Sequence, residues 1–196
     1  MDKAVDFYFD VGSPAAYLAW TQLPAIAQAT GARIDYKPML LGGVFQATGN
    51  HSPTTVPAKG DYMMADLGRY ARRYGIPFRT NPCFPINTLT LMRAATAVQM
   101  REPARFSGFV DAVYQAIWAD AKNMNDPQLV GEVLRAAGFD PAAMVAQAAE
   151  PEVKDRLKAV TQDAVARGVF GAPSFIVDGI LYWGQDRLDF VKEALK

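Results

Sequence analysis

The sequence contains only one cysteine, Cys83, and only one histidine, His51. A single cysteine excludes an internal disulfide and a CxxC redox pair. A single histidine argues against a metal cluster and against a catalytic triad that depends on histidine. Cys83 lies among prolines in a predicted loop, where no neighbouring residue would activate its thiol. We therefore expect no metal site and no catalytic role for Cys83.

The sequence also lacks net charge and long apolar runs. Its 20 basic and 20 acidic side chains cancel, so long-range attraction to nucleic acid or to an anionic membrane is not expected. No apolar run approaches the roughly 18 residues that a membrane-spanning helix needs. A strand is predicted almost at the N-terminus, so we expect no targeting peptide and a cytoplasmic protein. The 196 residues, 51% of them hydrophobic, predict one domain or one domain with an insertion.

The stretch VDFYFDVGSPAAYLA, residues 5–19, predicts a buried strand that turns through Gly12 into a helix starting at Ser13. A hydroxyl on the first turn of a helix lies beside free backbone N–H groups and the positive end of the helix dipole. An anion or a thiolate is stabilised there. Serine followed by proline is also an ordinary helix start, N-cap and then N1. On this stretch alone, the cap explains Ser13.

The first half of the chain predicts a strand, a helix and a second strand. The helix is expected over residues 14–30, with a kink or break near Leu23 because Pro24 lies inside it, and the second strand over residues 33–38. This order favours a parallel strand pair with a right-handed crossover. Residues 39–60 have no periodicity, so we expect a long irregular segment there, and its glycines match no phosphate-binding motif.

The middle of the chain has the periodicity of helices. Asp61 is predicted to cap the first of them, and Asn87 is predicted to cap the one that follows a proline-rich loop. Another helix is expected from Pro103. Three further helix starts are indicated by an acidic residue followed by proline, at positions 126–127, 140–141 and 150–151.

The end of the chain predicts β-structure again. Residues 174–177 and 180–183 are expected to pair as strands, because Asp178-Gly179 between them favours a two-residue hairpin turn. A closing helix is predicted over residues 187–195. Pro173 stands just before the hairpin, where a cis peptide bond would expose a backbone edge, and a trans-proline opening an edge strand is the alternative.

The order of predicted elements is β-α-β, a block of helices, and then α-β-β-α. Two ends that together make one α/β layer indicate a thioredoxin-like domain interrupted by an inserted all-helical domain. We expect residues 1–42 and 152–196 to form the discontinuous thioredoxin-like domain. Residues 43–151 are expected to form the inserted loop and helical domain.

Four separated motifs make the chain resemble a known family. FYFDVGSPAAYLA, GNHSPTTVPAKGDYMMADL, VFGAPSFIVDG and WGQDRLDFV, in that order, resemble the kappa-class glutathione transferases. They are equally similar to the bacterial 2-hydroxychromene-2-carboxylate isomerases, within the larger DsbA-like group. The resemblance covers essentially the whole chain and implies a thioredoxin fold with a helical insertion, a glutathione cofactor and a homodimer.

The resemblance also implies a set of site residues. Ser13 matches the serine that replaces the redox cysteine and hydrogen-bonds the sulfur of glutathione. Asn50 and Lys59, in the loop that also contains His51, would bind the glycine end of glutathione. Ala172, just before Pro173, would pair through its backbone with the cysteinyl unit of glutathione. Gly12 stands where relatives often carry a bulky apolar residue, which predicts a more open pocket floor. The implied glutathione-binding residues are Asn50, Lys59, Ala172, Pro173, Gln185 and Asp186.

Several functions are compatible with these residues. A thiolate stabilised by Ser13 would add reversibly to a conjugated aromatic substrate in an isomerase, and would be consumed on an electrophile in a transferase. A non-catalytic glutathione-binding protein is a third alternative. A disulfide oxidoreductase is excluded, because Ser13-Pro14-Ala15-Ala16 replaces the CxxC motif. Asn87 and Trp118 are candidates for the acceptor pocket, although helix capping and core packing already explain them.

Overall fold

The computed structural model describes residues 3–196, so the first two residues of the expected 1–42 segment lie outside it. Its sheet has four strands in the order β2-β1-β3-β4. Strand β1 (Ala4–Phe9) pairs in parallel with β2 (Arg33–Pro38) and antiparallel with β3 (Ser174–Val177). Strand β4 (Ile180–Trp183) pairs antiparallel with β3. This order confirms the thioredoxin-like fold, and it puts the two ends of the chain side by side in one sheet.

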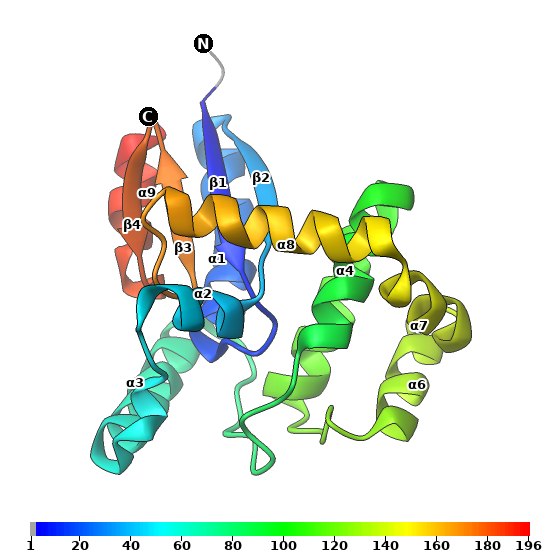
Figure 1. Cartoon of the computed structure of the whole chain (residues 1–196). Helices are drawn as coiled ribbons and strands as arrows, with labels where there is room; N and C mark the ends of the chain where they lie inside the picture. The colour runs from blue at the N-terminus through cyan, green and yellow to red at the C-terminus, as the bar shows by residue number, and fades with distance from the viewer. Residues whose placement is uncertain (1–2) are drawn as a thin grey trace.

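The two faces of the sheet are covered by different helices (Figure 1). Helices α1 (Pro14–Thr30) and α9 (Leu188–Ala194) pack against each other, and they share a core with Phe7 and Phe9 of β1. The rings of Phe7 and Phe175 stack with centroids 5.2 Å apart, which joins β1 to β3. Helices α2 (Leu41–Thr48) and α8 (Pro151–Ala166) cover the opposite face, over Tyr8 and Ile176.

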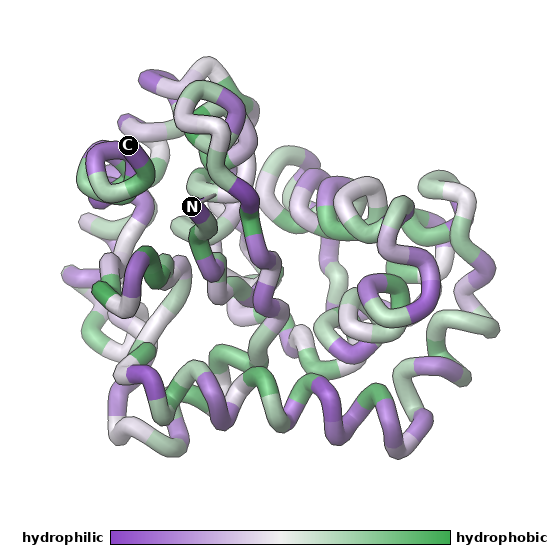
Figure 2. Tube along the Cα trace, turned by 90° about the horizontal axis from the view of Figure 1, so that it is seen from above, coloured by the Kyte–Doolittle hydropathy of each residue, from purple (hydrophilic) through white to green (hydrophobic). Residues whose placement is uncertain are grey.

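Helix α8 extends from the sheet to the helical block (Figure 1). In Figure 2, hydrophobic and hydrophilic residues alternate along the helices around the sheet, as expected where one face is buried. The sheet and the block share one continuous core, so the predicted division after residues 42 and 151 stays a prediction. The other helices of the block are α4 (Leu89–Arg101), α5 (Phe106–Tyr114), α6 (Pro127–Ala136) and α7 (Pro141–Ala149), whereas α3 (Pro57–Tyr74) lies apart from α4, α6 and α7 in Figure 1 and contacts α1.

The three helix starts that were predicted from an acidic residue followed by proline are confirmed. The side chain of Asp126 accepts a hydrogen bond from Gln128 N, and that of Asp140 accepts one from Ala142 N. Asn87 also caps, because its side-chain oxygen accepts from Leu89 N at 3.2 Å, although the N-cap position itself belongs to Thr88. Helix α5 carries aromatic side chains that are buried in the core. It lies between a short 3-10 turn, Pro103–Arg105, and a π-helical segment, Gln115–Ala119.

The expectation of an irregular segment over residues 39–60 is wrong. Most of it is helical: α2 is followed by a 3-10 turn at Pro53–Thr55, and α3 begins at Pro57. Gly43 allows α2 to approach α8 closely, since a β-carbon there would lie 3.3 Å from Thr161 Cγ2. Tertiary packing therefore overrides the poor helix propensity of Gly42-Gly43.

Two further expectations about helices are corrected. Asp61 does not cap α3; the helix begins one turn earlier, with Val56 at the N-cap and Pro57 at its first position, where proline is favoured. Of the predicted kink or break near Leu23, the break is wrong, because α1 continues through Pro24 to Thr30, where Gly31 ends it in the left-handed conformation. Pro24 is on the exposed side, so water can satisfy the backbone carbonyl that lacks its helical donor.

Among residues 3–196, none of the helices combines the length and the apolar character that a membrane span requires.

Candidate functional site

Ser13 lies between the end of β1 and the start of α1, where it is 4% exposed. Its Oγ accepts a hydrogen bond from Ala16 N at 3.1 Å, so it caps the helix as the sequence predicts. The same hydroxyl donates to the backbone oxygen of Ala172 at 3.0 Å. The peptide bond between Ala172 and Pro173 is cis, which decides between the two predicted alternatives. The antiparallel pairing of β1 and β3 thus brings Ser13 and the segment before Pro173 together.

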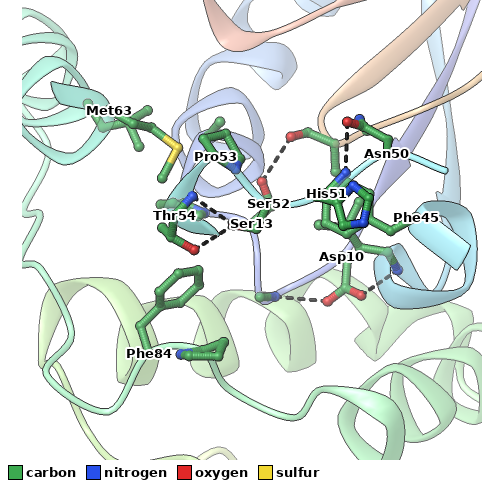
Figure 3. Close-up of a pocket in the computed structure, with 18 of the residues that line it drawn as sticks. Asp10, Ser13, Phe45, Asn50, His51, Ser52, Pro53, Thr54, Met63 and Phe84 are labelled. Carbon is green, nitrogen blue, oxygen red and sulfur yellow. Dashed lines mark hydrogen bonds between the residues drawn. The ribbon is translucent and has the colours of Figure 1, made fainter. Parts of the chain in front are cut away.

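A cavity of about 760 Å³ opens beside Ser13. Lining residues come from the loop after β1, the segment between α2 and α3, the loop before α4 and the turn after β4. Figure 3 shows Asn50 and His51 on one side of Ser13, and Met63 and Phe84 on the other. Of Ser13 and the predicted glutathione-binding residues, only Pro173 does not line the cavity. Those that do are Ser13, Asn50, Lys59, Ala172, Gln185 and Asp186.

Asn50 joins two walls of the cavity. Its side-chain amide donates to Phe170 O at 2.8 Å, and its side-chain oxygen accepts from His51 N at 2.8 Å. The loop after α2 is thereby attached to the segment that leads to Ala172. Lys59, in the first turn of α3, is exposed and lines the cavity near this loop. This end of the cavity therefore offers an ammonium group and the remaining N–H of an amide.

The turn after β4 forms another wall. Gly184 has φ 103°, a conformation that favours glycine, and its N–H donates to Pro173 O at 3.0 Å. The 3-10 turn Gln185–Arg187 follows directly. Asp186 is paired with Arg187 at 2.6 Å, and Gln185 is buried, with its backbone oxygen accepting from the hydroxyl of Tyr74. Of these side chains, Asp186 supplies the negative charge at the cavity.

The side of the cavity that Figure 3 labels with Met63 and Phe84 is mostly apolar, with Thr54 as a polar residue on it. Trp118, a candidate for the acceptor pocket, is instead fully buried and donates to Val11 O at 2.9 Å. Asn87, the other candidate, does not line the cavity either. Cys83 is also outside the lining. Sequence reasoning missed this surface, although the proline-rich segment around Phe84 was a signal. The apolar lining residues are Pro53, Met63, Leu67, Phe84, Pro85 and Ile86.

Asp10, the residue after β1, was also missed. It lines the cavity but is only 1% exposed, and its carboxylate accepts hydrogen bonds from Gly12 N, Leu41 N and the hydroxyl of Thr88. Burial raises the pKa of the Asp10 carboxyl group above its ordinary value, and the three hydrogen bonds partly offset this effect. Sequence reasoning missed Asp10 because this residue directly follows β1 and continues the alternating pattern of the strand.

Gly12 does not open the pocket floor as the sequence predicted. A β-carbon at position 12 would lie 2.9 Å from Thr88 Cγ2, so the threonine already fills the space beside the glycine. The floor of the cavity is closed by a side chain from the start of α4. Among residues 3–196, no group of three His, Cys, Asp or Glu side chains is placed to hold a metal ion.

Comparison with known proteins places this geometry among related chains. The family model of the DSBA-like thioredoxin domain matches residues 4–196. The chain is 34% identical over 197 residues to a 2-hydroxychromene-2-carboxylate isomerase of Sphingobium xenophagum, covering 100% of this chain and 99% of the relative. It is 26% identical over 207 residues to glutathione S-transferase kappa 1 of Homo sapiens, covering 100% of this chain and 92% of the relative. A solved structure of 2-hydroxychromene-2-carboxylate isomerase superimposes with a TM-score of 0.85 at 30% identity, covering 98% of this chain and 94% of that one.

Proposed function

Because the chain belongs to the DSBA-like thioredoxin family, with 2-hydroxychromene-2-carboxylate isomerases and kappa-class glutathione transferases as relatives, we propose that it is a glutathione-dependent cis-trans isomerase. Its proposed substrate is a conjugated aromatic compound of the 2-hydroxychromene-2-carboxylate type. The observation that carries the proposal is the hydrogen-bonding of Ser13 at the start of α1, beside Ala172 and the cavity.

The Ser13 hydroxyl has one fixed atom and one that can be redirected. Its oxygen is held by the N–H of Ala16, whereas its proton is directed at the carbonyl of Ala172. Rotation about the Cβ–Oγ bond turns the proton toward the cavity without moving the oxygen. The carbonyl of Ala172 then becomes free to accept from the backbone of a bound peptide. The N-terminus of the 17-residue helix α1 adds a second stabilising contribution for an anion near Ser13.

The side chains around Ser13 fit the charges of glutathione. Lys59 and the remaining N–H of Asn50 suit the carboxylate at the glycine end. Asp186 at the opposite wall suits the ammonium of the γ-glutamyl end, with Gln185 beside it. A cavity that offers an ammonium group at Lys59, a hydroxyl at Ser13 and a carboxylate at Asp186 supports glutathione as the ligand.

In this proposal, bound glutathione would supply a thiolate nucleophile that adds reversibly to the conjugated substrate, allows rotation about the former double bond, and is then eliminated unchanged as the double bond re-forms. Ser13 donates a hydrogen bond to the sulfur anion and keeps its own covalent bonds throughout. The N-terminus of α1 and the hydrogen bond from Ser13 would both stabilise the anion relative to the neutral thiol. The protein therefore lowers the thiol pKa without being consumed.

The test is to mix the protein with glutathione and 2-hydroxychromene-2-carboxylate and to follow ultraviolet absorbance. We expect isomerisation above the rate in buffer, with glutathione recovered unchanged by mass spectrometry. S-methylglutathione is the matched control, because it has the same charges but no thiol, and it should give no rate. A rate equal to that of buffer would contradict the proposal.

A glutathione transferase is the second candidate, and one observation favours it. The wall formed by Met63, Leu67 and Phe84 carries no basic side chain, so it suits an uncharged electrophile better than an aromatic carboxylate. Product analysis separates the two functions. A stable thioether between glutathione and the acceptor supports the transferase, and unchanged glutathione supports the isomerase.

A further inference from the structure

Asp10 is a buried carboxyl group whose partners are hydrogen-bond donors rather than a cation. Its Oδ1 accepts from Gly12 N at 2.9 Å, and its Oδ2 accepts from Leu41 N at 2.8 Å and from Thr88 Oγ1 at 3.1 Å. No ion pair that the structure gives within residues 3–196 includes Asp10. A buried carboxylate is costly, so its retention needs an explanation.

The three donors belong to three walls of the cavity. Gly12 precedes Ser13, and Ser13 N also donates to the backbone oxygen of Asp10 at 3.0 Å. Leu41 begins α2, which leads to Asn50. Thr88 follows the apolar segment around Phe84 and precedes α4. One carboxylate therefore links the Ser13 turn to the two segments that face it across the cavity.

Helix α2 depends on this carboxylate for its N-terminal cap. The residue at the N-cap position, Leu40, has no side-chain oxygen, and the donor that Asp10 accepts from is the first helical N–H. The helix has only eight residues and begins with Leu41-Gly42-Gly43, a weak helix former. Asp10 thus stabilises the helix that carries the chain toward Asn50.

Gly12 and Thr88 make the third hydrogen bond possible. The hydroxyl of Thr88 makes no capping hydrogen bond to α4 and is directed at Asp10 instead. Its methyl group lies where a side chain at position 12 would be, 2.9 Å from the β-carbon position. Gly12 is not among the glycines with positive φ, so close packing rather than backbone conformation requires it.

We propose that Asp10 is a positioning residue for Ser13, which it holds in place through Gly12, Leu41 and Thr88. It acts through these groups and not by contact with the reacting atoms. The consequence rests on the proposed function: the lowering of the thiol pKa of bound glutathione depends on the hydrogen bond between Asp10 and Thr88.

Thr88→Val is the sharpest test, because it removes one donor to Asp10 and leaves the carboxylate in place. The thiol pKa of bound glutathione is measured from thiolate absorbance against pH. We expect Thr88→Val to raise it by roughly half a pKa unit or more relative to the wild type. Thr88→Ser, which keeps the hydroxyl, should recover most of the shift.

Thr96→Val is the control, because Thr96 lies in α4, the helix that Thr88 precedes, and is buried as Thr88 is. The Thr96 hydroxyl donates only to Met92 O within α4 and does not line the cavity. Gly12→Ala is an independent variant, because its methyl group must displace Thr88 from Asp10, and it should reproduce the shift of Thr88→Val. A thiol pKa in Thr88→Val equal to that in Thr96→Val overturns the proposal.

A ligand-free measurement separates this proposal from the proposed function. Amide hydrogen exchange of Gly12 and Leu41, followed by NMR, should be at least several-fold faster in Thr88→Val than in Thr96→Val. If the wild type does not lower the thiol pKa at all, the proposed function fails. The positioning role of Asp10 is then decided by amide hydrogen exchange alone. Equal exchange in the two variants overturns the positioning role of Asp10.

Discussion

The hydroxyl of Ser13 donates to the backbone oxygen of Ala172, 159 residues later in the chain, at 3.0 Å. This contact joins the N-terminal β-α unit to the C-terminal hairpin at the point where the cavity opens. It also explains how a helix cap and a proposed catalytic group can be the same residue. The cap uses the lone pair of the oxygen, and the chemistry would use the proton.

The first prediction concerns Ser13→Ala, which removes both the cap and the hydroxyl proton. We expect the thiol pKa of bound glutathione to rise toward that of free glutathione, and the free energy of unfolding to fall by about 1 kcal/mol through loss of the cap. Thiolate absorbance against pH and urea denaturation measure the two effects.

The control for this variant is Ser107→Ala, at an exposed position of α5. It should change neither quantity. A Ser13→Ala protein that lowers the thiol pKa as the wild type does would leave only the helix cap as the role of Ser13.

The second prediction concerns the positive end of the cavity. Lys59→Met removes the ammonium group that is proposed to bind the glycine carboxylate. Because the side chain is exposed, we expect a modest loss, about 0.5–1 kcal/mol or two- to fivefold in the dissociation constant of glutathione. The salt dependence of binding should also become weaker. Isothermal titration at two ionic strengths measures both.

Lys158→Met is the control, since Lys158 is exposed on α8 and does not line the cavity. It should bind glutathione as the wild type does. Equal losses in the two variants would indicate a general effect of net charge and would exclude a specific contact from Lys59.

The strands, the turn and the helix starts could be predicted because their signals are local. The hairpin at Asp178-Gly179 depends on two adjacent residues with positive φ, and the caps at Asp126 and Asp140 on single side chains. Helix α2 was missed because its cap comes from Asp10, 31 residues earlier, and its packing from Thr161 on α8. A short stretch of sequence around α2 contains neither Asp10 nor Thr161.

The candidate site divides in the same way. Ser13 and the position of Pro173 before the hairpin were accessible from sequence, whereas the choice between a cis and a trans bond at Pro173 needed the structure. The apolar wall was not accessible, because Met63 comes from α3 and Phe84 from a separate loop, and only tertiary packing brings them together. The buried role of Asp10 depends on three separate segments and was likewise hidden.

The third prediction concerns the pH dependence of stability. Burial raises the pKa of Asp10 in the folded state, so the folded protein holds this proton at a pH where the unfolded chain has released it. The stabilising contribution is fully present below the unfolded pKa and is lost as pH rises through the folded pKa. Asp10→Asn removes the titration. We therefore expect the stability of the wild type relative to Asp10→Asn to decrease with rising pH in that window.

Urea denaturation of both proteins between these two pKa values tests the sign. A carbon-13 titration of the Asp10 carboxyl group gives the folded pKa directly. A stability difference that is constant with pH, together with a carboxyl pKa at or below the ordinary value, would contradict the prediction.

The fourth prediction concerns the apolar wall. Phe84 and Phe78 both pack on Trp118, with centroid distances of 5.6 and 6.2 Å, but only Phe84 lines the cavity. Phe84→Ala and Phe78→Ala should therefore lose similar amounts of stability through the same neighbour. Only Phe84→Ala should weaken binding of the aromatic substrate, by roughly tenfold in KM, which corresponds to about 1.4 kcal/mol of lost apolar contact.

The dissociation constant of glutathione separates the two ends of the cavity in these variants. Phe84 lies on the opposite side of Ser13 from Asn50 and His51. The dissociation constant of glutathione should therefore stay within a factor of two of the wild type, roughly 0.4 kcal/mol, in both variants. Steady-state kinetics and isothermal titration measure the two quantities. Phe84→Ala and Phe78→Ala proteins with the same KM for the aromatic substrate would show that the acceptor binds elsewhere in the cavity.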